Sequence, residues 1–320
     1  MSRLLYDNII VEIIKILAQN GETRSLSHLC MAKKLDISIE EPLIFDHVIS
    51  EKDRTFKLRI TINPSEKITI DWGDGNVEVI ENVDDMFQLH VVVRHVYTDF
   101  SKSKKYRVII SGSKYSVKHI GHLDNWADGI TDFKTLGNLG ITDLSDLFHN
   151  CSEFNGRLSE NFNTTGVTDM GYMFCSAVNF NQPFPAGWDT ENVRDMRSMF
   201  YNAKSFNQPL NFNTENVIDM GYMFCFAMNF NQSLNFDTKN VCNMSYMFSF
   251  ATSFNQPLNW DTSNVRDMDH MFRNTKSFNQ LLNFNVLNVT YMRSMFYDAT
   301  SFNKSLNWKL NSITYKNLDQ

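Results

Sequence analysis

The sequence lacks long hydrophobic runs, an excess of positive charge and any recognisable catalytic motif. No stretch of the 320 residues approaches the roughly 18 consecutive apolar residues that a membrane helix needs. The formal net charge is −6, which gives no electrostatic reason to expect DNA, RNA or an anionic membrane as a partner. A glycine-rich phosphate loop, a nucleophile elbow and a cysteine–histidine pair are all missing, so we expect neither an enzyme nor a cofactor.

Cysteine is scarce and odd in number, with five residues in the whole chain. Cys175 and Cys225 occupy one column of the repeat described below, two repeats apart, which would separate them by about 10 Å and put them beyond disulfide reach. Reduced thiols favour an intracellular, cytoplasmic location. The N-terminus also has no small-x-small cleavage site of a signal peptide. A cell-surface location is the alternative.

What the sequence has in abundance is one repeated phrase. Phenylalanine occurs 26 times and methionine 16 times, mostly inside it. The pair Met-Phe, opened by the variant Leu147-Phe148, recurs every 24 or 26 residues at Met173-Phe174, Met199-Phe200, Met223-Phe224, Met247-Phe248, Met271-Phe272 and Met295-Phe296. A fixed period of this length predicts a solenoid in which each repeat is one coil stacked on the next.

The columns of the repeat predict which side chains fill the coils. In one repeat the recurring apolar positions are Val265, Met268, Met271, Phe272, Phe278, Leu282 and Phe284. We expect a strand over the Val-x-x-Met stretch and a short helical turn at Met-Phe-x-x-Ala. The invariant column from Asn155 to Asn303 predicts hydrogen bonds to backbone groups of its own and the next coil. A second column, in which Gly166 exchanges with Asn192 and its equivalents, suggests a positive φ.

Residues 141–320 closely resemble the BspA-like leucine-rich-repeat family, whose repeats read "NVTNMSYMF…ATSFNQPLNNWDTS". The resemblance implies a parallel, leucine-rich-repeat-like solenoid that serves in adhesion or protein binding. Residues 117–140 are then expected to form its N-terminal cap.

The stretch before the repeats predicts β-structure. In "KITIDWGDGNVEVI" the apolar residues alternate on both sides of a Gly73-Asp74-Gly75-Asn76 turn, which indicates a hairpin. The set Trp72-Gly73-Asp74-Gly75, His95-x-Tyr97 and Tyr106-x-Val108 resembles a PKD-like β-sandwich module, which we assign to residues 51–116. Such modules often precede BspA-type repeats.

Residues 1–50 are predicted to be a helical segment. The opening "LxDxIIxEIIxxL" and the later "LxxLxxxxKxL" resemble an F-box, although Tyr6 stands where that family usually has proline. An amphipathic helical cap is the alternative. The face expected to bind a partner consists of Leu4, Leu5, Ile9, Ile13, Leu26 and Leu29.

Three groups of polar residues were weighed as sites. The column Asp169, Asp195, Asp219 and Asp267 is interpreted as a solvated edge, because a ladder of similar carboxylates does not separate their pKa values as acid–base catalysis requires. His119, His122 and Asp124 are too few for a zinc site, so no metal is expected. The partner-binding surface is expected at positions that vary while the core does not: Arg194, Arg197, Tyr222, Tyr246, Arg266, His270, Tyr291 and Arg293.

The predicted fold class is therefore a repeat solenoid of leucine-rich-repeat-like parallel β coils of 24–26 residues, preceded by a small β-sandwich and an N-terminal helical segment. The predicted function is a non-enzymatic protein–protein interaction scaffold. If the F-box resemblance holds, it implies a substrate adaptor for a cullin-type ubiquitin ligase that binds the linker subunit, a pairing suited to a eukaryote or a large DNA virus. An exported surface adhesin and, third, a carbohydrate-active solenoid enzyme are the alternatives.

Overall fold

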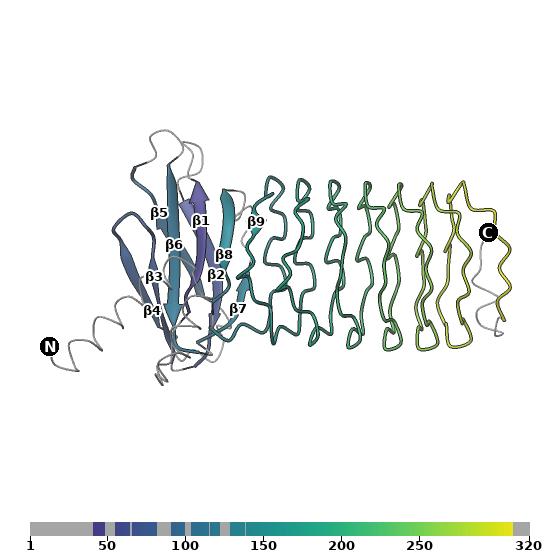
Figure 1. Cartoon of the computed structure of the whole chain (residues 1–320), viewed down its shortest axis with the longest axis horizontal. Coiled ribbons are helices and arrows are strands. Elements are labelled where there is room, and N and C mark those ends of the chain that lie inside the picture. Colours follow the sequence, from purple (N-terminus) through teal and green to yellow (C-terminus); the bar gives the residue numbers. More distant parts are fainter. Residues whose placement is uncertain are drawn as a thin grey trace.

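The computed structural model describes residues 41–48, 55–64, 66–81, 91–99, 104–114, 116–121, 129–137 and 139–309. Two regions lie end to end along the long axis (Figure 1). A sheet region, residues 43–135, occupies one end, and a repeat region, residues 139–309, extends from it as a row of similar turns. Within the described residues no helix is present that is long and apolar enough to cross a membrane.

The sheet region holds two β-sheets. The six-stranded sheet has the order β4-β3-β6-β1-β8-β9, and the three-stranded sheet has the order β5-β2-β7. Neighbouring strands are antiparallel, except that β8 and β9 are parallel. The strands are β1 (Leu43–Val48), β2 (Thr55–Ile62), β3 (Lys67–Asp71), β4 (Val77–Glu81), β5 (Val91–Val96), β6 (Lys105–Gly112), β7 (Val117–Gly121), β8 (Ile130–Thr135) and β9 (Arg157–Leu158).

Alternating side chains hold the two sheets together. In β2 the buried residues are every second one, Phe56, Leu58, Ile60 and Ile62, as expected for a strand with one face in a core. Phe56 packs on Phe45 of β1 at a ring-centroid distance of 5.6 Å, so the central strands of the two sheets face each other. The apolar residues of both sheets and of the repeats form one continuous core.

The expected hairpin is confirmed as β3 and β4, which pair in antiparallel register from Lys67↔Glu81 to Asp71↔Val77. Gly73 takes a φ of 75°, and a Cβ there would lie 2.4 Å from the carbonyl oxygen of Arg107. Only glycine fits so close to a neighbouring backbone.

Both sheets continue into the repeat region. β8 pairs with β9, which lies inside the first repeat. On the other side, His119 of β7 forms a parallel bridge to Asp143. Asp143 in turn bridges to Asp169, and single bridges follow repeat by repeat as far as Tyr291. The sheet region therefore meets the first repeat through hydrogen-bonded backbone.

Each repeat forms consecutive tight turns beside its bridge. In the second repeat, Met173 N–H donates to the Met170 carbonyl and Ala177 N–H donates to the Phe174 carbonyl. Tyr172 and Ser176 each take a φ of 57° at these turns. Between the turns the backbone reaches the next repeat, as where Phe174 N–H donates to the Met199 carbonyl at 2.9 Å.

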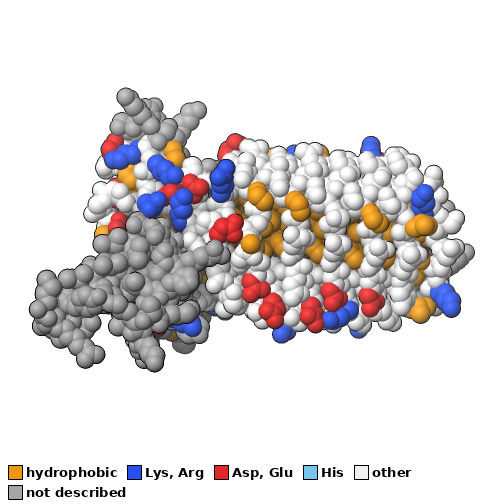
Figure 2. Space-filling model, in the orientation of Figure 1, with side chains coloured by type: hydrophobic (Ala, Val, Ile, Leu, Met, Phe, Trp, Pro, Cys, Tyr) orange, Lys and Arg blue, Asp and Glu red, His pale blue; other side chains and the backbone are white. Residues whose placement is uncertain are grey.

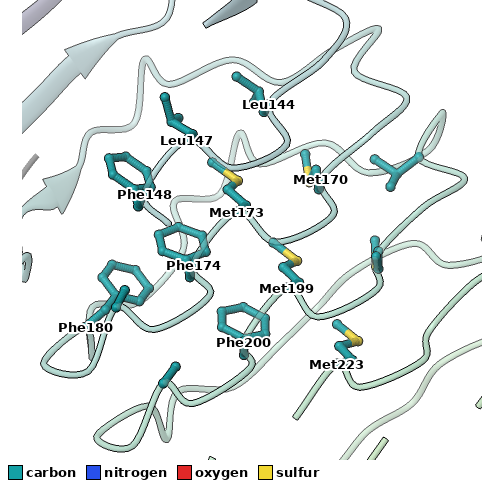
Figure 3. Close-up of a cluster of buried hydrophobic side chains, with 14 of the residues drawn as sticks. Leu144, Leu147, Phe148, Met170, Met173, Phe174, Phe180, Met199, Phe200 and Met223 are labelled. Carbon is teal, nitrogen blue, oxygen red and sulfur yellow. The ribbon is translucent and has the colours of Figure 1, made fainter. Parts of the chain in front are cut away.

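Aromatic rings stack from repeat to repeat inside the turns. The expected column of Phe206, Phe230 and Phe254 is confirmed, with nearly parallel rings 5.9 and 6.0 Å apart. A second column includes Phe174 and Phe200, which lie one above the next in Figure 3 beside the column of buried methionines. These rings are fully buried, so each repeat completes its core only against its neighbours.

The predicted fold class is wrong in its elements. No helix is present in the described residues, and the strands belong to two sheets of six and three strands instead of to a leucine-rich-repeat-like solenoid of parallel β coils. After β9 each repeat forms a single bridge to the next, because the left-handed turns that follow keep the backbone out of strand conformation, although its N–H groups continue to donate to the next repeat. Most of the predicted helical segment, including its F-box-like face, lies outside the described residues, and residues 43–48 within its range form β1.

The two asparagine columns have different outcomes. Asn231 Oδ1 accepts from the backbone N–H of Asn255 at 2.9 Å, and the same bond recurs along the invariant column, which confirms the predicted bond to the next repeat. In the second column Gly166 has a φ of 86°, but none of its asparagine equivalents has a positive φ. Asn216 instead donates through Nδ2 to the Glu191 carbonyl of the preceding repeat at 2.8 Å. Asparagine therefore occurs in this second column because its side chain forms a hydrogen bond to the preceding repeat, and not because the backbone needs a positive φ.

Candidate functional site: an aromatic strip along the repeats

The turns that follow each bridge carry side chains on the surface of the repeat region. In the fourth repeat, Met223 and Phe224 are buried, whereas Tyr222 before them is 37% exposed and Phe226 after them is partly exposed. Tyr222 and Phe226 have φ values of 59° and 60°, so both lie at the left-handed corners of the turns. Since every repeat turns in the same register, these positions align into two neighbouring surface columns.

Aromatic side chains occupy several of these positions and contact one another, and His149 and Tyr201 add to them from the position directly after Leu-Phe or Met-Phe. Tyr222 and Tyr246 stack with ring centroids 4.4 Å apart and planes 7° apart, and His270 continues the row 4.5 Å beyond Tyr246. Phe226 stacks on Phe250 at 4.5 Å. We call this surface the aromatic strip, made of His149, Tyr172, Tyr201, Tyr222, Phe226, Tyr246, Phe250 and His270. Figure 2 shows, on the face it presents, hydrophobic side chains gathered in a band along the repeat region.

Two adjacent hollows open in the strip. The first, of about 400 Å³, is lined by His149, Tyr172, Cys175, Ser198, Tyr201 and Tyr222. The second, of about 320 Å³, is lined by Tyr201, Tyr222, Cys225, Phe226, Tyr246, Ser249, Phe250 and Arg273. Tyr201 and Tyr222 form the wall that the two hollows share.

The strip is neutral in its middle and has a basic side chain at each end, one of them paired with a carboxylate. Burial raises the pKa of Tyr222 to about 12 and that of the Cys225 thiol to about 12, so both stay protonated at neutral pH. At one end, the hydrogen bond from His149 Nδ1 to Asp146 Oδ1, 2.9 Å long, raises the pKa of His149 to about 10. At the other end the Arg273 guanidinium lies over the Tyr297 ring, 5.0 Å from its centroid.

The structure brings together three of the eight residues predicted to bind a partner, namely Tyr222, Tyr246 and His270. Arg197 is paired with Asp195 at 2.7 Å, and Arg293 is paired with the buried Asp269 at 2.6 Å. The remaining three are exposed but line neither hollow: Arg194, Arg266 and Tyr291.

Sequence reasoning missed His149, Tyr172, Tyr201, Phe226, Phe250 and Arg273. All but Tyr172 occupy the two positions after Leu-Phe or Met-Phe, where the sequence predicts a helical turn. A signal was available, because those two positions vary between repeats as freely as the positions flanking the bridge.

The aspartate column is half-buried, so its interpretation as a solvated edge needs correction. Asp169 Oδ1 accepts from the backbone N–H two residues on, at 2.8 Å, and its equivalents do the same. Burial raises the pKa values of Asp169, Asp195 and Asp267. Each carboxylate is occupied by its own turn, which accounts for the column without catalysis.

The histidine pair weighed as a metal site is only partly described. His119 Nδ1 lies 3.2 Å from Asp143 Oδ1, while His122 and Asp124 lie outside the described residues. Among the described residues, no three or more histidine, cysteine, aspartate or glutamate side chains come together in a way that could hold a metal ion.

A family model described as "Mycoplasma protein of unknown function, DUF285" matches residues 114–235 and 234–318. Because the two matches together cover more than half of the chain, this protein belongs to the DUF285 family. That membership is consistent with a BspA-like repeat family. The matched segments take in the whole aromatic strip. Comparison with curated proteins and with solved structures gave no match.

Proposed function

We propose that this protein is a non-enzymatic scaffold that binds a protein partner through the aromatic strip. The observation that carries this proposal is the contrast between columns: the inward positions repeat the same residues, while the strip positions change from tyrosine to serine, histidine, cysteine or arginine. The stacking of one repeat on the next requires the inward residues to be constant, but it does not constrain the residues of the strip. Tyrosine and arginine are also the residues that dominate binding energy at protein interfaces.

The strip has the dimensions of a binding surface for a segment of a partner rather than a whole domain. It runs over about six repeats, which at about 4.8 Å each corresponds to roughly 25–30 Å. Its hollows are shallow and share a wall, so a partner would fill both at once.

The sheet region supports a finer proposal, that it is a PKD-like module. The residues that suggested it contact one another: Trp72 stacks on His95 with centroids 4.7 Å apart, His95 Nε2 lies 2.8 Å from Asp74 Oδ2, and the Tyr97 hydroxyl donates to the Trp72 carbonyl at 3.2 Å.

The further proposal of a ubiquitin-ligase adaptor rests on residues 1–50, most of which lie outside the described residues. It would place the protein inside the cell, in keeping with Cys151, Cys175, Cys225 and Cys242, which form no disulfide within the described residues.

Affinity capture followed by mass spectrometry tests the scaffold proposal. The bait is the full chain, compared with a Tyr201→Ala/Tyr222→Ala/Tyr246→Ala variant and with a matched control in which the exposed Ile218, outside both hollows, becomes alanine. We expect a specific set of proteins that the control retains and the triple variant loses. Equal capture by all three baits would refute the strip as the binding surface. Omitting residues 1–40, which leaves β1 in place, tests the adaptor proposal separately, through loss of the linker subunit alone.

A further inference from the structure

The second hollow combines apolar walls with one unsatisfied cation. Arg273 lines it, its Nε is buried, and that atom donates no hydrogen bond to any residue that the structure describes. Unlike Arg197 and Arg293, Arg273 also forms no ion pair within the described residues. The Arg273 guanidinium therefore has no carboxylate partner among the described residues, and an anionic group bound in the hollow would supply one.

The two hollows repeat at a defined interval. The residues lining the first belong to the first four repeats, and those lining the second belong to the third to sixth, so their centres are two repeats apart. At about 4.8 Å per repeat the interval is about 9–10 Å. A polyproline II helix rises about 3.1 Å per residue with three residues per turn, or about 9.3 Å per turn. Its residues i and i+3 therefore match the spacing of the hollows.

The walls favour such a helix over a glycan. Sugar rings stack on exposed aromatic faces, but the faces here are largely used within the strip, since Tyr222 stacks on Tyr246 and Phe226 on Phe250. Aromatic-lined grooves of this kind receive proline-rich segments, whose preformed helix loses little entropy on binding.

Resting on the proposed function, we propose that the partner of the aromatic strip is a proline-rich peptide segment in polyproline II conformation. Prolines at i and i+3 occupy the two hollows, and an acidic residue flanking them pairs with Arg273.

Fluorescence anisotropy with synthetic peptides and the full chain tests this proposal. The probe is a fluorescein-labelled peptide of about nine prolines, roughly three turns, flanked by glutamates at both ends so that either direction presents a carboxylate. The matched probes replace the glutamates by lysines, or the prolines by a glycine–serine sequence of the same length. The variants are Tyr222→Ala in the shared wall, Arg273→Met, and Ile218→Ala as the control.

We expect the glutamate-flanked proline peptide to bind more tightly than both matched probes. Tyr222→Ala should weaken it by about tenfold or more, Arg273→Met should remove the preference for glutamate over lysine flanks, and Ile218→Ala should change neither. Because Tyr222 is well exposed, a melting temperature near that of the parent chain shows that the variant still folds.

Two results would overturn the inference. One is equal affinity for the proline and glycine–serine peptides. The other is binding of a linear glucan, tested with cellohexaose, that Tyr222→Ala abolishes, because it would assign the strip to carbohydrate. If the peptides fail while the capture experiment still loses its partners in the strip variant, the scaffold stands and only the partner class is wrong.

Discussion

The sheet region and the repeat region share one core, yet they are stabilised in different ways. In the sheet region the key contacts occur once each, as in the cluster of Trp72, His95 and Asp74. In the repeat region the same contact occurs many times, with stacked phenylalanines in every repeat 4.0–4.2 Å from their partner in the same repeat. The comparison teaches that a repeated contact lets surface residues vary freely, because no single repeat has to specify the fold.

The largest expected effects test whether contacts that occur once and contacts that are repeated stabilise the protein differently. Trp72→Ala and Phe206→Ala each remove a fully buried ring, so each should lower the free energy of unfolding by about 3–5 kcal/mol. The two substitutions should differ in how far the loss of protection against amide exchange extends. Trp72→Ala should weaken protection across both sheets, whereas Phe206→Ala should weaken it mainly in the adjoining repeats, because repeats interact with their nearest neighbours. Hydrogen exchange measured by mass spectrometry shows both patterns.

Phe302 provides the matched control for Phe206. It belongs to the same ring column, but it is only partly buried and stacks on one neighbouring repeat, at 5.9 Å from Phe278. Phe302→Ala should therefore cost clearly less than Phe206→Ala. Equal costs would mean that stacking on both sides does not stabilise the column.

The sequence predicts the two regions unequally for the same reason. In the repeat region the same residue recurs at the same position of every repeat, so the buried position of Phe206 and the hydrogen-bonding role of Asn231 could be predicted from the repeat alone. Strand β1 could not, because its buried run Leu43–Phe45 is short and its partners are distant, with Leu43 opposite Ile110. The left-handed corners at Tyr222 and Phe226 were also missed, since glycine or asparagine usually marks such positions. That omission hid the column of Phe226 and Phe250 within the aromatic strip.

The next prediction concerns polar contacts that only the repeat region multiplies. Asn231 Oδ1 accepts from the backbone N–H of Asn255 at 2.9 Å and from Gln256 Nε2 at 3.1 Å. Asn231→Ala leaves these donors without their acceptor and should cost about 1–3 kcal/mol in chemical denaturation. Asn235→Ala, at an exposed position of the same repeat, should be nearly neutral. If Asn231→Ala left the free energy of unfolding unchanged, water would be able to replace these hydrogen bonds between repeats.

Acidification should affect the two regions in opposite directions. Burial raises the pKa values of Asp169, Asp195 and Asp267 above 3.8, so their contribution to stability is present below 3.8 and is lost as the pH rises through their folded-state pKa values. In the sheet region burial alone would raise the pKa of Asp46, but hydrogen bonds from Arg107 and Lys105 hold it below 3.8. Its contribution is present above 3.8 and is lost as the pH falls through the lowered value.

Lowering the pH from about 7 toward 3.8 should therefore stabilise the repeats while leaving the Asp46 ion pairs intact. The measure is amide exchange, corrected for the intrinsic effect of pH, and the expected gain is below about 1 kcal/mol because the carboxylates are partly solvated. An Asp169→Asn/Asp195→Asn/Asp267→Asn variant should lose this response. Asn243 shows that asparagine suits the column, since its Oδ1 accepts from the Ser245 N–H at 2.9 Å. A response that persists in the variant would assign it to other groups.

The smallest predicted effect tests whether the left-handed corners store strain, which the sheet region confines to glycines such as Gly73 and Gly75. Ser294 has a φ of 48°, a conformation that costs a residue with a Cβ about 1–2 kcal/mol. Ser294→Gly removes that cost but gives the unfolded chain about 0.4–1 kcal/mol of additional entropy. We expect a net stabilisation of about 0.5 kcal/mol in thermal denaturation. Ser205→Gly, at a position in the same region without a positive φ, should destabilise instead, and the same sign for both variants would show that these corners carry no strain.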